Sequence, residues 1–461
     1  MKNSERDIYL DMYLENNANR QLEELKELLR IPSVSTQPDH KKDMIRGAQW
    51  LVEHLKKIGI EHVELIETDG HPLVYGDWLH AGDNGLTVTM YGHYDVQPAE
   101  PFDAWLTPPF EPSVREHALY ARGTTDDKGQ LFVLLKALEA FLGVKGKLPV
   151  NVKVILEGDE ETGRPILATY LNENPEKLTA DICLISDTAL LSPEQPCIPY
   201  SLRGIWAGEF VVRGPKTDLH SGIYGGVIHN PAQALAEIIA GLHDPEGRVT
   251  VPGFYDEVAV LDPLERERLA RVPQDKTGIL EKTGAPALYG EPGFTPVEQL
   301  GARPTLEVNG IWGGFTGQGY KTVIPAEARV RIGCRVVPNQ DPNRLGHLVV
   351  EHVNRLAPPT VSVDVIPIAA IGSVLIDPNT AAIRAASKAY EWAFGTPPIL
   401  TREGGGIPVV SCFQNCLKSQ IALMGFGLLD DNAHAPNEKI HLPNFYKGIK
   451  TVIYFLDCLQ C

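Results

Sequence analysis

Residues 150–163 read VNVKVILEGDEETG, and this stretch combines a strand pattern with a cluster of acids. Its apolar run over residues 152–156 has the length and composition of a buried strand. Four acidic side chains follow it: Glu157, Asp159, Glu160 and Glu161. Two carboxylates about 4 Å apart repel by roughly 4 kcal/mol at an effective dielectric of 20. Water, basic partners or a metal ion must therefore offset the charge at the end of this strand.

Outward from this stretch, other apolar runs also end in polar residues that can bind a metal ion or act in catalysis. LTVTMYGHYD ends in His93 and Asp95, and ADICLISDT ends in Asp187. RGTTDDKG, which holds Asp126 and Asp127, leads directly into the helical pattern QLFVLLKALEAFL. Strands that alternate with helices in this way indicate an α/β domain with a mostly parallel sheet.

The character of the chain changes near Arg203. IWAGEFVVRGP alternates like a half-exposed strand, and TLEVNGIWGG, EARVRIGCRVVP and VSVDVIPIA also have strand patterns. Two helical patterns lie among them. We therefore expect a smaller α+β domain over residues 206–390, inserted into an α/β domain that comprises residues 1–205 and 391–461.

Charge and composition exclude several classes of partner. The chain has 42 basic and 59 acidic residues, a net charge of −17, which argues against nucleic acid or an anionic membrane as a partner. The N-terminal stretch lacks an apolar signal core, and no run approaches 18 uncharged apolar residues. Among the seven cysteines, Cys183 and Cys334 lie in strand-like runs as expected buried free thiols. We expect a cytoplasmic protein.

Metal-competent side chains follow several strands of the predicted sheet. Active residues of open α/β sheets gather at the carboxyl ends of the strands. The candidates here are His93, Asp95, Asp126, Asp127, Glu160, Glu161, Asp187 and His434. Imidazole and carboxylate ligands suit zinc or manganese. Cysteine is absent from the set, so an open catalytic site fits better than a closed structural one.

Each candidate also has a simpler interpretation when taken alone. His93 could be a hydrogen-bonded core histidine, and His434 could lie in a surface loop. Asp126-Asp127 and Asp187 could cap helices, while Glu160-Glu161 could form a solvated turn. Their joint occurrence at strand ends of one sheet favours the metal site.

The charge sum favours two ions. If Asp126 bridges them, with Glu161 on one ion and Asp187 on the other, the three carboxylates carry −3. Two dications contribute +4, so one bridging hydroxide leaves the centre neutral. Paired metal ions about 3.5–4 Å apart are an established hydrolytic device.

The motifs together resemble the M20 family of dinuclear metallopeptidases, in the branch of carnosine dipeptidase and cytosolic nonspecific dipeptidase. The resemblance spans about residues 20–455 and rests on motifs in the family's order: YGHYDVQPA, RGTTDDKG, EGDEETG, ISDT, DLHSGIYGG, KTVIPAEARVRIGCRVVP, TREGGGIPV and HAPNEK. It implies a catalytic domain with an inserted lid and dimerisation domain.

The resemblance also implies a ligand set for two divalent ions, zinc or manganese. His93, Asp126 and Asp187 would hold one ion, and Asp126, Glu161 and His434 the other. Asp126 would be joined to Asp127 by a cis peptide. Asp95 would orient His93, and Glu160 would act as general acid/base toward a bridging hydroxide.

Further residues would bind substrate in the manner of the family. His220 would reach into the partner subunit's site of a homodimer and stabilise the oxyanion. Arg335 would pair with the substrate's free carboxylate, with Thr322 and Asn309 placing the substrate. The turn over residues 402–406 would offer backbone groups of Gly405 and Gly406. The branch usually has serine where this chain has Gly406, which puts fine substrate preference in doubt.

The resemblance therefore implies metal-dependent hydrolysis of dipeptides or short peptides. An N-acyl amino acid deacylase or a carboxypeptidase of the same family is the alternative, and a non-catalytic scaffold is the third possibility. A scaffold could lack Glu160 or one of the metal ligands, but this chain has all of these residues. For Glu157 and Asp159 two interpretations stay open: hydrogen bonding to neighbouring groups and plain solvation.

Overall fold

The chain divides into two compact units in the computed structural model, which describes residues 8–82, 85–273 and 276–460. The larger unit comprises residues 1–200, 376–400 and 409–461, and the smaller unit comprises residues 201–375 and 401–408. The expected insertion is therefore present. Its end differs from the expected boundary at 390, because α12 (Ala381–Phe394) packs on α14 (Leu442–Cys458) and thus belongs to the larger unit.

A six-stranded sheet forms the centre of the larger unit. Its order is β1-β2-β6-β3-β7-β18. The pairs β6–β3, β3–β7 and β7–β18 are parallel, whereas β2 is antiparallel to both its neighbours. The predicted α/β class with a mostly parallel sheet is confirmed. The strands are β1 (Glu61–Ile66), β2 (Leu73–Trp78), β6 (Asn151–Glu157), β3 (Thr87–His93), β7 (Ile182–Ile185) and β18 (Gln420–Leu423).

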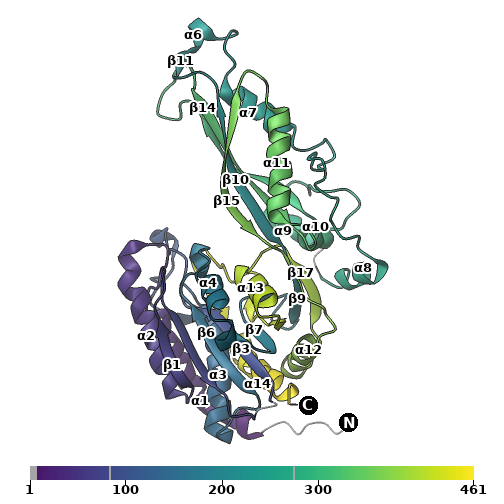
Figure 1. The fold of residues 1–461 in the computed structure, drawn as a ribbon. Coiled ribbons are helices and arrows are strands. Elements are labelled where there is room, and N and C mark those ends of the chain that lie inside the picture. Colours follow the sequence, from purple (N-terminus) through teal and green to yellow (C-terminus); the bar gives the residue numbers. More distant parts are fainter. Residues whose placement is uncertain (1–7, 83–84, 274–275, 461) are drawn as a thin grey trace. The chain divides into compact units, whose positions relative to one another are not determined.

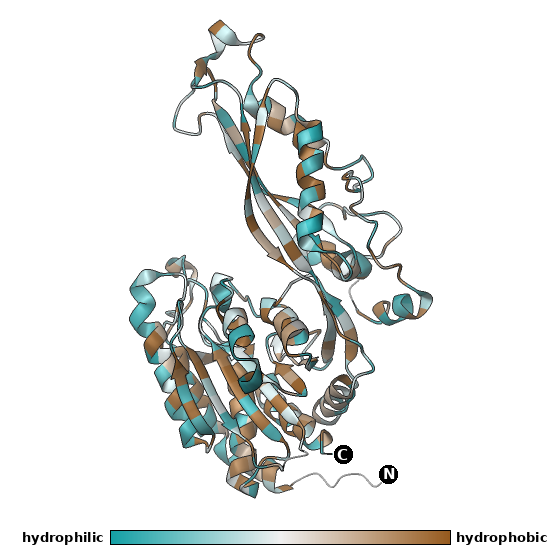
Figure 2. Ribbon diagram, in the orientation of Figure 1, coloured by the Kyte–Doolittle hydropathy of each residue, from teal (hydrophilic) through white to brown (hydrophobic). Residues whose placement is uncertain are grey.

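The central strands are buried because helices pack on the sheet. All seven residues of β6 and all four of β7 are buried, which is why these strands have continuous apolar runs instead of alternating ones. Figure 2 shows hydrophobic residues along these strands. Helices α1, α3, α14 and α12 lie side by side in that order (Figure 1). The helices not yet given are α1 (Ile8–Leu29), α2 (Lys41–Lys57), α3 (Lys128–Lys145), α4 (Ile166–Glu173), α5 (Pro175–Leu178) and α13 (Pro408–Cys416).

Short elements complete the larger unit. Three of its single turns are 3-10 helices: η1 (Pro38–His40), η2 (Phe102–Ala104) and η3 (Glu160–Thr162). The short strands are β4 (Ser113–Arg115), β5 (Ala118–Tyr120), β8 (Ala189–Leu190), β19 (Gly427–Leu428) and β20 (Lys439–His441). The chain passes between the units at four places: within β9 (Cys197–Leu202), just after β16 (Val374–Leu375), within β17 (Ile399–Glu403) and at the start of α13.

An antiparallel sheet of order β12-β14-β10-β15 forms the smaller unit. Helices α7 and α11 begin with Asn-Pro and Asp-Pro, where the Asn230 and Asp341 side chains cap the first turns. On α11, Leu345, Val349 and Val353 form one apolar stripe in the core beneath the sheet. The bounds are β10 (Gly204–Arg213), β11 (Leu219–His220), α6 (Ser221–Tyr224), α7 (Pro231–Ala240), α8 (Pro263–Leu269), α9 (Lys276–Thr283), α10 (Pro296–Ala302), β12 (Thr305–Gly313), β13 (Val323–Ile324), β14 (Glu327–Val336), α11 (Pro342–Leu356) and β15 (Ser362–Ile371).

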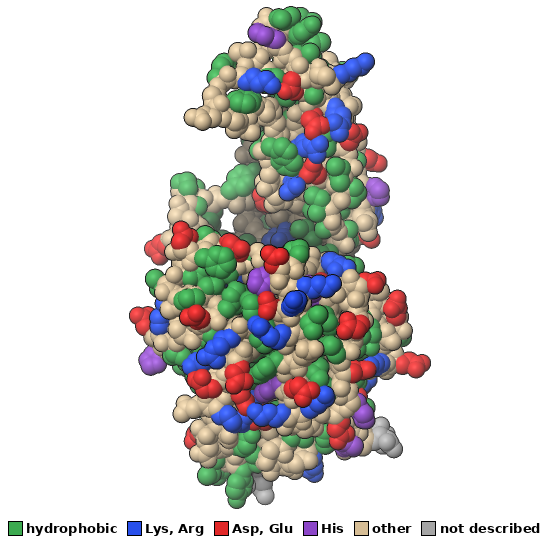
Figure 3. Space-filling view, turned by 90° about the vertical axis from the view of Figure 1, so that its left-hand side faces the viewer, with side chains coloured by type: hydrophobic (Ala, Val, Ile, Leu, Met, Phe, Trp, Pro, Cys, Tyr) green, Lys and Arg blue, Asp and Glu red, His purple; other side chains and the backbone are tan. Residues whose placement is uncertain are grey.

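Surface and thiol chemistry agree with the composition. Figure 3 shows acidic and basic side chains interspersed over the larger unit. None of the helices in the described ranges is long and apolar enough to cross a membrane. Cys183 and Cys334 are buried free thiols, as predicted. The cytoplasmic location stays a prediction.

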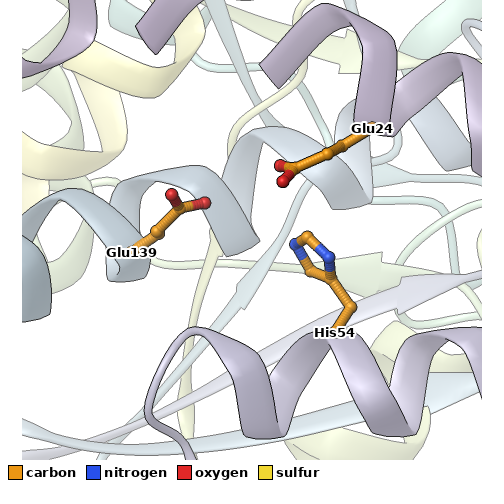
Figure 4. A group of neighbouring side chains, drawn as sticks. All are labelled: Glu24, His54 and Glu139. Atoms are coloured by element: carbon orange, nitrogen blue, oxygen red, sulfur yellow. The ribbon is translucent and has the colours of Figure 1, made fainter. Parts of the chain in front are cut away.

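Three potential metal ligands, Glu24, His54 and Glu139, come together between α1, α2 and α3 (Figure 4). Lys136 occupies the space between them. Its Nζ lies 2.5 Å from both Glu24 Oε2 and Glu139 Oε2, and 3.0 Å from His54 Nε2. The Lys136 ammonium and the Arg20 guanidinium each pair with both carboxylates and offset their charge, so this cluster is a buried ion-pair network that joins three helices.

His54 makes this network sensitive to acid. Burial, and then the Lys136 ammonium, lower the pKa of His54 from 6.5 to about 3. Between these values the unfolded chain binds a proton that the folded chain does not, so stability falls as pH falls. We expect the free energy of unfolding to lose about 2 kcal/mol from this group between pH 7 and pH 5. Urea unfolding of the wild type and His54→Gln at both pH values measures this loss.

The matched control is His80→Gln, because His80 is an exposed histidine of the same unit. It should keep the wild-type difference between the two pH values. An equal pH dependence in wild type and His54→Gln would contradict the assignment to His54.

Candidate dinuclear metal centre

Three neighbouring parallel strands lead to three of the predicted ligands, His93, Glu161 and Asp187. Asp126 and His434 were also expected at strand ends of this sheet, but they lie before α3 and between β19 and β20, outside the six-stranded sheet. β3 ends at His93, which lies opposite Glu157 at the end of β6. Asp187 follows the end of β7, which pairs with the other side of β3. Because parallel strands end at the same edge of a sheet, the loops after them bring these side chains together.

Two groups of potential ligands overlap at this edge. His93, Asp126 and Asp187 form one group, and Asp126, Glu161 and His434 form the other, with ligand atoms within 4.8 Å of one another in each. Asp126 belongs to both: its Oδ1 lies 3.0 Å from His93 Nε2 and its Oδ2 lies 2.8 Å from His434 Nε2. One carboxylate therefore faces both imidazoles, as a bridging ligand must.

The polar atoms of this centre fit divalent cations. His93 Nε2 and Glu161 Oε1 are buried. Asp126 Oδ1 and His434 Nε2 lie 3.0 and 3.3 Å from them, but neither contact has hydrogen-bond geometry. A buried polar atom without a partner is costly, and a metal ion satisfies a nitrogen lone pair and a carboxylate oxygen at once. The donors are imidazole and carboxylate groups, which suits zinc or manganese.

Charge crowding points the same way. Burial, and then the nearby Asp126 carboxylate, raise the pKa of Asp187 well above its usual range. Burial raises the pKa of Glu160 to about 7, and the carboxylates of Glu161 and Asp95 act in the same direction. Bound dications would reverse these shifts, because they stabilise the charged form of each acid.

Neighbouring carboxylates fix the backbone that carries the ligands. Asp95 Oδ2 accepts a hydrogen bond from the Glu161 N–H at 3.0 Å. His93 Nδ1 lies 3.1 Å from the Asp95 carbonyl oxygen and 3.4 Å from its Oδ1. Asp95 thus contacts Glu161 through its side chain, and His93 through both its carbonyl oxygen and its side chain.

Asp127 also holds a ligand residue in place. The peptide bond between Asp126 and Asp127 is cis. Asp127 precedes α3, but its side chain does not cap the helix; Oδ2 accepts a hydrogen bond from the His93 N–H at 3.1 Å. A Cβ on Gly92 would lie 2.9 Å from this oxygen and 2.5 Å from Leu131 Cβ, so glycine is required for the close approach of α3 and β3.

Sequence reasoning missed one residue of the centre, Gln97. Its Nε2 donates a hydrogen bond to Glu161 Oε2 at 2.6 Å, which leaves Oε1 for the second ligand group. Gln97 lies two positions after Asp95 and four after His93. Residues two positions apart in an extended segment point the same way, so the spacing that links His93 to Asp95 also leads to Gln97.

Comparison with known proteins identifies the family. Residues 89–457 match the family described as peptidase family M20/M25/M40. The chain belongs to peptidase family M20. The M20 chain is 35% identical over 442 residues to the Cys-Gly metallodipeptidase dug1 of Schizosaccharomyces pombe, covering 92% of each protein. It is 29% identical over 466 residues to the human Beta-Ala-His dipeptidase, covering 97% of this chain and 92% of that protein.

A solved structure agrees with this assignment. The crystal structure of the M20 family metallo-carboxypeptidase Sso-CP2 from Sulfolobus solfataricus has a TM-score of 0.86 and 32% identity, and covers 95% of this chain and 99% of that chain. The resemblance drawn from the motifs is thus confirmed. The protein is a hydrolase of the metallopeptidase class, in the dipeptidase branch of family M20.

The two acids of the M20 peptidase that the sequence left open are hydrogen-bonded. Glu157 is buried and its Oε2 accepts a hydrogen bond from the Tyr91 hydroxyl at 2.9 Å. Asp159 Oδ2 accepts one from the His71 N–H at 2.5 Å. Plain solvation is therefore excluded for both, and their carboxylates connect β6 to neighbouring segments.

In the smaller unit of the peptidase, two predicted substrate residues lie on neighbouring strands, Asn309 near the middle of β12 and Arg335 near one end of β14. Asn309 lies at an irregularity of β12, and its Oδ1 would be 2.4 Å from a Cβ on Gly333. Gly333 and Arg335 are two positions apart on β14, so they share a face. Asn309 and Arg335 therefore lie on the same face of the sheet.

The other two predicted residues, His220 and Thr322, belong to the segments of β11 and β13, which pair with each other. β11 lies beyond the opposite end of that sheet (Figure 1). The Ser221 N–H donates to the Thr322 carbonyl at 3.1 Å. His220 is exposed, and its Nδ1 accepts a hydrogen bond from the Gly222 N–H at 2.9 Å. This bond favours the tautomer with a proton on Nε2, which can then donate to a substrate oxygen.

The turn over residues 402–406 of the peptidase is held by a buried arginine that sequence reasoning missed. Arg203 Nε donates to the Gly404 carbonyl at 3.2 Å, and its Nη1 donates to the Arg303 carbonyl at 3.2 Å. A Cβ on Gly406 would lie 2.6 Å from the Arg203 carbonyl oxygen. Serine at this position would require the backbone to shift, so the departure from the branch is built into the local fold.

Proposed function

We propose that this M20 peptidase hydrolyses the amide bond of dipeptides or short peptides with two divalent ions, zinc or manganese. The observation that carries the proposal is Asp126, whose two oxygens face the imidazoles of two separate ligand groups. His93 and Asp187 would complete one site, and Glu161 and His434 the other. The named activities of the relatives, on Cys-Gly and on Beta-Ala-His, support a dipeptide substrate.

Glu160 is assigned to proton transfer in this proposal. When bound, the ions would polarise the scissile carbonyl and make a shared water more acidic. Glu160 precedes the ligand Glu161 in η3 and belongs to neither ligand group. Its carboxylate takes a proton from the attacking water and delivers it to the leaving amine nitrogen. Asp95 orients the His93 imidazole and the Glu161 backbone.

Substrate contacts are assigned to the smaller unit. Arg335 would pair with the free carboxylate of the substrate through its planar guanidinium group, and Asn309 on the same face would place the adjoining amide. Gly405 and Gly406 would offer backbone groups. Because Gly406 lacks a hydroxyl, one hydrogen bond that serine supplies in the branch is lost or made by water.

We also propose that the peptidase acts as a homodimer in which His220 and Thr322 of one subunit serve the site of the other. Arg335 pairs with Ile205 on β10, and Glu327 pairs with Arg213. Eight residues of extended strand separate these pairs, about 26 Å at about 3.3 Å per residue. Arg335 near one end of this sheet and His220 beyond the other end are too far apart to contact one small substrate from the same chain, which supports the use of two chains.

The alternative substrate is supported by one comparison. Sso-CP2 is named a metallo-carboxypeptidase, and a deacylase of N-acyl amino acids would need the same chemistry. These activities differ in what lies on the amino side of the scissile bond. Free dipeptides present an ammonium group there, whereas acylated amino acids and longer peptides do not.

A substrate panel tests the proposal. We expect kcat/KM for Xaa-Ala dipeptides to exceed that for N-acetyl and N-succinyl amino acids by at least about tenfold, because a site built for a charged group rejects analogues that lack it. Removal of metal with a chelator should abolish the activity, and added Zn²⁺ or Mn²⁺ should restore it. Higher kcat/KM on acylated amino acids, or on longer peptides, would replace the dipeptidase proposal with one of the alternatives.

A further inference from the structure

Two segments that are distant in sequence carry ligands of the second group. Asp126 lies at the end of the turn over residues 121–127, and His434 lies in the loop between β19 and β20. Neither segment is held by the central sheet. The pairing of β5 with β20 joins their ends, and a single carboxylate supplies most of the remaining contacts between them.

Glu438 is the last residue of the His434 loop and is fully buried. Its Oε1 accepts hydrogen bonds from the N–H groups of Thr125 and Asp126, at 2.9 and 3.2 Å. Its Oε2 accepts hydrogen bonds from the Gly123 N–H at 2.8 Å and from Arg122 Nη1 at 2.7 Å. Four donors of one turn thus converge on one side chain of the His434 loop.

The charges of this contact are matched. The Arg122 guanidinium is buried beside the Glu438 carboxylate, and its Nη2 donates to the Pro98 carbonyl at 3.1 Å. A buried ion pair is strongly destabilised when one partner is removed, because the other charge stays without compensation. The ion pair and the backbone hydrogen bonds to Glu438 therefore fix the conformation of the turn as well as its contact with the loop.

The His434 loop itself needs such support. Asn432, His434 and Asn437 have positive φ values of 57°, 60° and 62°. The cost of this region is about 1–2 kcal/mol for a residue such as His434 and less for asparagine, whose short polar side chain tolerates it, so the conformation of His434 depends on the surrounding structure. Glu438 directly follows Asn437, so its buried carboxylate fixes the end of this strained loop.

We propose that Glu438 is a positioning residue that sets Asp126 and His434 at the separation required by the second ion, the one held by Asp126, Glu161 and His434. The inference rests on the proposed dinuclear centre. Glu438 contacts no substrate; it acts through the backbone of Asp126 and through the loop of His434. The first ion shares only Asp126 with this arrangement.

Glu438→Gln tests the proposal through metal binding. The amide keeps the size of the side chain, but its NH₂ group would replace a carboxylate oxygen that now accepts hydrogen bonds, so two donors would face each other. We expect the affinity for the second Zn²⁺, measured by competition with a chromophoric chelator, to fall by at least about tenfold, the scale found for residues that orient metal ligands. The affinity for the first Zn²⁺ should fall by less.

Glu24→Gln is the matched control, because Glu24 is a buried glutamate in the ion-pair network with Lys136. It should lower stability and leave both zinc affinities unchanged. If Glu438→Gln does not fold, Glu438→Asp supplies the measurement, since it keeps the charge and shortens the reach.

The outcomes separate the proposals. An unchanged second affinity in a folded Glu438 variant, or an equal loss in Glu24→Gln, would overturn the role of Glu438 while leaving the dinuclear centre intact. Wild-type protein that binds fewer than two Zn²⁺ ions per chain would overturn both.

Discussion

Replacing Glu160 with alanine is expected to reduce turnover by at least about a hundredfold while zinc binding is retained. General acid–base groups contribute about 10²–10⁴ to the rate, and without Glu160 the proton must pass through bulk water. Glu160 is in neither ligand group, so its loss leaves the ligands in place. The measurement is kcat on the best dipeptide of the panel, together with the number of Zn²⁺ ions per chain.

The burial and charge around Glu160 explain why its effect should be large. Burial raises the pKa of Glu160 to about 7, and bound dications would lower it, so that the carboxylate is charged at neutral pH and can take a proton from the attacking water. Glu176→Ala is the control, because Glu176 is an exposed acid at the start of α5. Unchanged turnover in Glu160→Ala would refute the assignment, and loss of zinc would make Glu160 a ligand instead.

The fold could be predicted largely from local patterns. The continuous apolar run of β6 and the helical run of α3 indicate buried parallel strands with covering helices, because each pattern reflects burial on particular faces. The end of the inserted unit could not be placed in this way. α12 is helical in either unit, and only its packing against α14 and β18 assigns it to the larger one.

The candidate site was partly visible in the sequence for a different reason. Ligands that directly follow strands, such as His93 and Asp187, are found once the strand pattern is recognised. The division of ligands between two ions came from the family resemblance instead. The spacing alone does not determine which carboxylate is shared.

Residues that act through distant partners could not be found. Gln97 is 64 positions from Glu161, and Glu438 is 312 positions from Asp126. A single sequence does not show such contacts, because each residue has an ordinary solvated alternative. Arg203 is a third case: its hydrogen bond to Gly404 spans 201 positions, and its strand context resembles that of any surface arginine.

Replacing His220 with alanine is expected to reduce kcat by about 10²–10³, the cost of losing one oxyanion donor, with zinc binding unchanged. The Nδ1 of His220 accepts the Gly222 N–H, so the variant removes the Nε2 donor without touching a metal ligand. Lys321→Ala is the control in the same segment, because Lys321 is an exposed residue next to Thr322. The measurement is kcat together with zinc content.

Mixing His220→Ala with Glu160→Ala decides whether the sites are shared between chains. Under the shared arrangement, a heterodimer combines an intact Glu160 on one chain with an intact His220 on the other, so one of its two sites works. Random exchange makes about half of the dimers mixed, so about a quarter of the wild-type turnover should return in a two-fold dimer. If His220 served its own chain, both sites of the heterodimer would lack one residue. Verified heterodimers without recovered turnover would therefore contradict sharing, and the 26 Å separation estimated along β10 would then have to be overcome by a change within the smaller unit itself.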